Sequence, residues 1–90
     1  MDANKLALSS LAMDLKRVAL GLHNGSYATA SRFIEEAKKR KQEINSKQLA
    51  PYMQTVIDKL DHVLADSKND RTAEDALMYS QLIQNYVLHN

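Results

Sequence analysis

The chain has 90 residues, a formal net charge of +1, 44% hydrophobic residues and no cysteine. This length suits one hydrophobic core, so we expect a single domain over residues 1–90. The absence of cysteine excludes disulfides and thiol chemistry, and the near-neutral charge gives no strong field for nucleic acid or acidic lipid. No run approaches the roughly 18 apolar residues of a membrane span. The first residues also lack a signal-peptide pattern, so we expect a cytoplasmic protein.

Two glycines and one proline are too few for the many tight turns of a small β-rich fold, so the composition predicts an all-α protein. The first helix is predicted over residues 4–22, because apolar residues follow a 3-4-3-4 spacing there. This stripe consists of Leu8, Leu11, Leu15, Val18 and Leu22. The following residues, 23–25, end the helix, since Asn and Gly tolerate the left-handed closing conformation.

Three further helices are predicted along the chain. The second covers residues 27–45, with Ser26 as its N-cap and with an apolar face formed by Tyr27, Ala30, Ile34, Ala37 and Ile44. Pro51 suits the first turn of a third helix over 51–65, and a polar break over 66–70 precedes a fourth helix over 71–88. Four helices with short links predict an antiparallel up-down-up-down four-helix bundle.

The first and last helices carry more apolar residues than one core-facing stripe needs. In the first helix, a second stripe repeats every seven residues on roughly the opposite side from the core stripe. The last helix contains no Lys, Arg, Asp or Glu from Ala76 onward. Because these helices are neighbours in such a bundle, we expect a shared apolar surface that forms a homodimer or binds another protein. We call it the predicted patch, and its residues are Leu6, Met13, Leu20, Met78 and Leu82.

An alternative function starts from Arg17 and His23, which are separated by five residues. This spacing resembles the Arg-x(4–6)-His pattern of the HEPN family, helical bundles that include ribonucleases. The resemblance implies that the two side chains meet at a dimer cleft, where one orients a phosphate and the other performs acid–base chemistry. We expect instead a surface arginine and a helix-terminal histidine, and therefore a protein that is not an enzyme and has no catalytic residues.

A second alternative is nucleic-acid binding through the only basic cluster, at the end of the second helix. Its residues are Lys38, Lys39, Arg40 and Lys41. Phosphate contacts would use such a cluster, but Glu35, Glu36 and Glu43 lie among these cations and weaken their field. We therefore expect a solvated helix face and do not expect nucleic acid as a partner. The three histidines are far apart in sequence, so neither a metal site nor a cofactor is expected.

Overall fold

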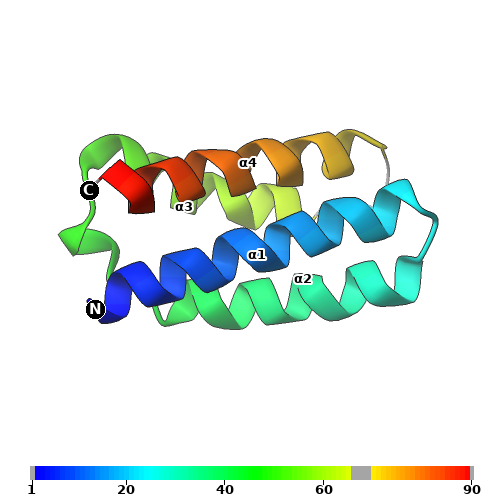
Figure 1. The fold of residues 1–90 in the computed structure, drawn as a ribbon, viewed down its shortest axis with the longest axis horizontal. Helices are drawn as coiled ribbons and strands as arrows, with labels where there is room; N and C mark the ends of the chain where they lie inside the picture. The colour runs from blue at the N-terminus through cyan, green and yellow to red at the C-terminus, as the bar shows by residue number, and fades with distance from the viewer. Residues whose placement is uncertain (1, 66–69, 90) are drawn as a thin grey trace.

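The computed structural model describes residues 2–65 and 70–89, and in this part of the chain it contains four α-helices. They are α1 (Ala3–His23), α2 (Tyr27–Gln42), α3 (Pro51–Ala65) and α4 (Asp70–His89), with one turn of 3-10 helix, η1 (Ser46–Gln48), before α3. Successive helices run in opposite directions, so the predicted antiparallel four-helix bundle is confirmed (Figure 1). Most of the predicted break between α3 and α4, residues 66–69, lies outside the described residues.

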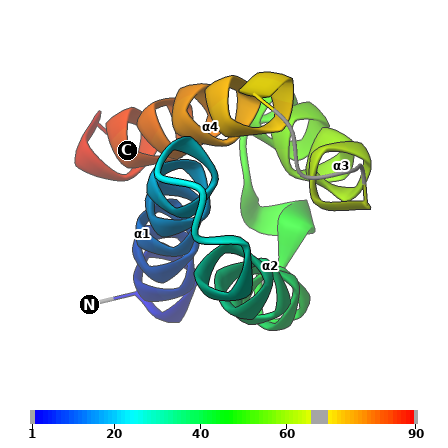
Figure 2. The same cartoon turned by 90° about the vertical axis from the view of Figure 1, so that its right-hand side faces the viewer.

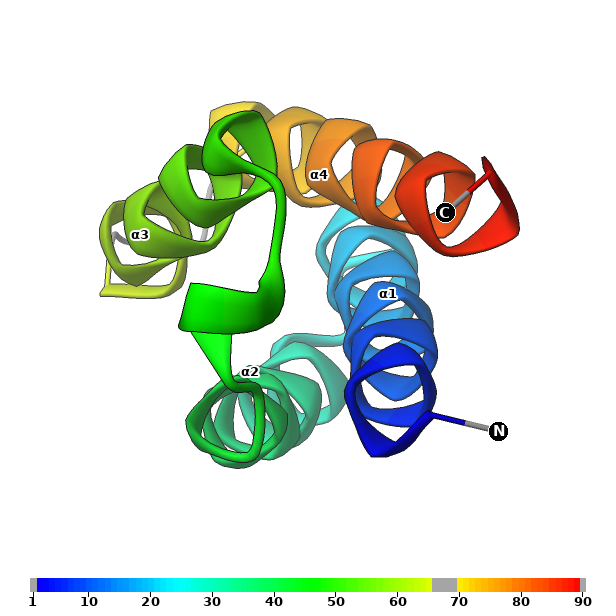
Figure 3. The ribbon, with the colours of Figure 1, turned by 90° about the vertical axis from the view of Figure 1, so that its left-hand side faces the viewer.

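Helix α1 makes the most extensive contacts in the bundle, with α2 on one side and α4 on the other. The two end views show it between α2 and α4, with α3 beside α4 on the side away from α1 (Figures 2 and 3). The stripe predicted to face the core does so, because each of its five residues is buried: Leu8, Leu11, Leu15, Val18 and Leu22. The core is completed from the other helices by residues such as Ile34, Met53, Leu60 and Ile83.

Helices α1 and α2 approach closely at the turn that joins them. Gly25 has a φ of 73°, the left-handed conformation that the predicted helix ending requires. A Cβ added at Gly21 would lie 3.0 Å from the backbone nitrogen of Ala30, which is closer than an ordinary van der Waals contact, so any other residue here would require α2 to shift away from α1. Ser26 occupies the predicted N-cap position of α2, but its side chain makes no capping hydrogen bond.

Helix α2 begins at Tyr27 as predicted, but the predictions of its last residue and of the burial of Tyr27 were wrong. The helix ends at Gln42 instead of residue 45, because the N–H groups of Glu43 and Ile44 donate to carbonyls only three residues back. Tyr27, the first residue of α2, is exposed instead of buried. Ile44 is half-buried and packs against the core from outside the helix.

Polar side chains hold the connection between α2 and α3 to the rest of the bundle. Asn4, buried at the start of α1, exchanges two hydrogen bonds with the backbone of Asn45. At the other side of the link, the backbone N–H of Ala50 donates to the hydroxyl of Tyr86 at 3.0 Å. The Tyr86 ring also packs edge-on against Tyr52 of α3, with 5.7 Å between the ring centroids. Both ends of the link are therefore fixed by residues of α1 and α4.

None of the helices in the described residues combines the length and the apolarity that crossing a bilayer requires.

Candidate functional site

All five residues of the predicted patch are exposed: Leu6, Met13, Leu20, Met78 and Leu82. The structure does not bring them all to one place. Met13 and Leu20 line a groove between α1 and α4, together with Leu77, a residue outside the predicted patch. The exposed fractions of these three side chains are 51%, 51% and 41%. The groove is therefore bordered by half-exposed apolar side chains from two helices that lie far apart in sequence.

The floor of this groove is closed by a contact between small residues. The hydroxyl of Ser80 on α4 donates to the carbonyl oxygen of Ala12 on α1 at 2.6 Å, and both residues are buried. With no large side chain at either position, the groove retains a volume of about 490 Å³. Gln81 and Gln84 form the α4 rim beside Leu77.

A second hollow of about 260 Å³ continues the groove toward the end of α1. The two hollows share Lys16, Leu20 and Leu77. The second hollow adds further lining residues from the end of α1 and the start of α4: Ala19, His23, Ala73 and Glu74. We call the two hollows together the α1/α4 groove.

The other members of the predicted patch lie away from this groove. Leu6 lines a separate hollow between α1 and α2, beside Arg40 and Glu43. Met78 and Leu82 follow Leu77 by one and five residues, which places them about 100° and about 140° around α4 from it. Neither lines the α1/α4 groove. The helix pattern predicts an excess of apolar surface on α4, but the rotation of α4 about its own axis decides which residue faces α1.

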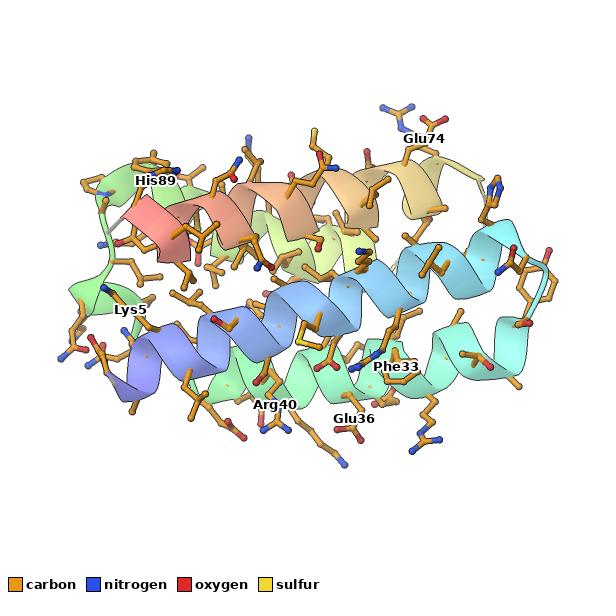
Figure 4. All side chains as sticks on the ribbon, viewed as in Figure 1. Lys5, Phe33, Glu36, Arg40, Glu74 and His89 are labelled. Carbon is orange, nitrogen blue, oxygen red and sulfur yellow. The ribbon has the colours of Figure 1, made fainter. Side chains whose placement is uncertain are left out.

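The few charged residues around the groove are separated by sign, with cations on α1 and an acid on α4. Lys16 and Arg17 lie on the α1 side, and Glu74 lies near the start of α4, where Figure 4 shows it pointing outward. Arg17 is engaged elsewhere: its guanidinium is 3.7 Å from the Asp14 carboxylate and 5.2 Å from the centre of the Phe33 ring. Within the described residues, Lys16 and Glu74 make no ion pair. They are therefore the two charges of the groove that have no counter-ion in this chain's described part.

Helix α1 contains a buried acidic residue, Asp14, whose burial the apolar pattern did not predict. Asp14 is buried, and burial raises the pKa of its carboxyl above the ordinary value. The positive charges of Arg40 and Arg17 lower this pKa, and the negative charge of Glu36 raises it, but burial is the largest effect. Glu36 and Arg40 both belong to α2, where Figure 4 labels them. The charges that act on the Asp14 carboxyl therefore come from both α1 and α2.

Each cation of the basic cluster on α2 is paired with an acid. Lys38 and Lys39 each pair with a glutamate three residues earlier in α2, and Arg40 pairs with Glu43, the residue that follows α2. Lys41 pairs with Asp61 of α3 at 2.8 Å. These pairs reduce the field that the cluster presents to a phosphate backbone, although nucleic-acid contact by these residues stays a prediction.

Arg17 and His23, the two residues of the HEPN-like pattern, point to different neighbours within the chain. The guanidinium of Arg17 stacks on Phe33 of α2. His23, in the last turn of α1, lines the hollow beside Ala73 and Glu74 at the start of α4. Both residues therefore border the α1/α4 groove, Arg17 in its first hollow and His23 in its second, but neither hollow is lined by both.

In residues 2–65 and 70–89, no group of three or more His, Cys, Asp or Glu side chains has the geometry to hold a metal ion. No protein-family model matches the sequence, and comparisons with curated proteins and with solved structures gave no match. Any functional conclusion therefore depends on the residues of this chain alone.

Proposed function

We propose that this protein is a non-enzymatic protein-interaction module whose binding surface is the α1/α4 groove. The observation that carries the proposal is the convergence of Met13, Leu20 and Leu77 on one groove. Complete burial of such a side chain gains about 1.5–3 kcal/mol, and each of these is about half exposed. Covering them would therefore gain roughly 1 kcal/mol for each side chain.

The dimensions of the groove suit a helix as the bound element. Its α1 side extends over residues 12–23, which is about 16 Å at 1.5 Å per residue, or three helical turns. Two parallel walls with apolar side chains between them are the surface into which an amphipathic helix places its apolar stripe. Such a helix would come from another protein, whereas a second copy of this chain would cover the groove with its own α1 and α4.

Site-specific photo-crosslinking in the native cell tests this proposal. A photoreactive amino acid at position 20 lies in the groove, and the same group at position 59 serves as the control, because Lys59 is exposed on α3. We expect a discrete crosslinked protein from position 20 and none of that mass from position 59. If position 20 gives no crosslink above the control, the groove is not a binding surface.

A further inference from the structure

We propose that the occupant of the α1/α4 groove is a second copy of this chain, with Lys16 of each copy against Glu74 of the other. This inference rests on the proposed function and names the partner of the same groove. Lys16 lies on the α1 side and Glu74 on the α4 side, with Leu20 and Leu77 lining the same hollow. A surface with one charge of each sign on opposite sides of an apolar strip is complementary to itself after a two-fold rotation.

A two-fold axis along the groove pairs the two charges only if Lys16 and Glu74 lie at nearly the same level along the groove, and they do. The Ser80–Ala12 hydrogen bond sets these residues at one level, and α1 and α4 run in opposite directions. Lys16, four residues after Ala12, is therefore level with Ala76, four residues before Ser80. Glu74 is two residues farther along, about 3 Å at the helical rise of 1.5 Å per residue. A lysine side chain spans such an offset.

A two-fold axis that lies in the interface and runs along the groove places α1 of one copy over α4 of the other. Each Lys16 then faces Glu74 of the other copy at nearly the same level, and the pairing occurs twice. Leu77 precedes Ser80 by three residues, so Leu77 of the other copy is level with residue 15, three residues after Ala12. This level lies between Met13 and Leu20. The apolar side chains of the two surfaces therefore alternate along the groove instead of colliding.

Apart from Glu74, the α4 residues that line the groove carry no charge that opposes this pairing. Residues 76–88 contain no Lys, Arg, Asp or Glu. An acidic helix from a different protein would satisfy Lys16 but leave Glu74 without a counter-ion, whereas a second copy satisfies both. Charge complementarity therefore favours self-association over an acidic partner.

Charge reversal with sedimentation equilibrium tests the register. We expect the wild type to dimerise, and Lys16→Glu or Glu74→Lys each to weaken the dimer about tenfold, because two exposed pairs are lost and two like-charge contacts arise. The double variant, and an equimolar mixture of the two single variants, should recover the wild-type affinity, since both restore opposite charges across the interface. Circular dichroism of each variant verifies that the helices are retained.

Two variants on α3 with the same charge changes serve as controls. Lys59→Glu and Asp58→Lys alter exposed residues outside the groove and should leave the dimer unchanged. High salt should reduce the effect of the groove variants.

Three outcomes would overturn the inference. A dimer that is insensitive to both groove variants, or one that the double variant fails to restore, excludes the Lys16–Glu74 pairing. A wild type that stays monomeric up to millimolar concentration, while position 20 crosslinks to a different protein, excludes the second copy but retains the proposed function. A monomer with no crosslink from position 20 excludes both.

Discussion

Replacing Asn4 by alanine tests how the connection between α2 and α3 is held to α1. The side-chain amide donates to the Asn45 carbonyl at 2.9 Å and to Gln48 Oε1 at 3.3 Å, and it accepts from the Asn45 N–H at 2.8 Å. Each good bond contributes about 1 kcal/mol net, and the third is long, so about 2 kcal/mol depend on this side chain. Asn45 is exposed, so water would replace part of the loss, and the higher helix propensity of alanine returns about 0.5 kcal/mol. We expect the free energy of unfolding to fall by about 1–2 kcal/mol.

Urea unfolding followed by far-UV circular dichroism measures this change. The matched control is Asn85→Ala, because Asn85 is an exposed asparagine in α4 and its replacement brings the same gain in helix propensity. Asn4→Ala should lower the unfolding midpoint without changing the slope, while Asn85→Ala should leave the midpoint unchanged or raise it slightly. If the two variants differ by less than about 0.5 kcal/mol, the hydrogen bonds of Asn4 do not hold the connection.

Two further substitutions probe the contact between α1 and α2. Gly21→Ala should lower the midpoint of thermal unfolding, because the new Cβ would lie 3.0 Å from the Ala30 nitrogen and push the two helices apart. This crowding costs about 1–3 kcal/mol, which exceeds the gain of about 1 kcal/mol in helix propensity. An unchanged or higher midpoint would contradict the close approach of α1 and α2. Asp14→Asn should be more stable than the wild type near neutral pH, because burial raises the carboxyl pKa, so that the ionised side chain disfavours the folded state above that pKa. This advantage should shrink as the pH falls through the raised pKa toward 3.8, the ordinary pKa of aspartate, and should be gone below 3.8, where both states of the wild type are protonated. Urea unfolding across this pH range would refute the assignment if the difference in stability did not change with pH.

Sequence periodicity was sufficient to predict the fold. The spacing of Leu8, Leu11 and Leu15 fixes which side of α1 is buried, because residues three and four apart share one helix face whatever packs against them. Pro51 at the start of α3 and Gly25 after α1 gave the ends of those helices through backbone preferences that act locally.

The sequence pattern did not predict contacts between residues that are far apart along the chain. Asn4 is polar and stands at a helix start, so nothing in its neighbourhood indicates that it is buried against Asn45, 41 residues away. Asp14 interrupts an apolar pattern in the way that an exposed residue does, yet α2 covers it. A polar residue gives no sign of burial when the element that buries it lies in another part of the chain.

The same limit explains why α4 contributes Leu77 to the groove and not the two residues predicted from its sequence. Met78, Leu82 and Leu77 are equally apolar and all are exposed, so composition does not distinguish them. What distinguishes them is the small pair Ser80 and Ala12, whose hydrogen bond turns one side of α4 toward α1. Scattered exposed side chains are ordinary on a small domain, where polar residues cannot cover the whole surface. An interface needs side chains from separate elements to converge, and here the convergence depends on a contact between two residues too small to enter any apolar pattern.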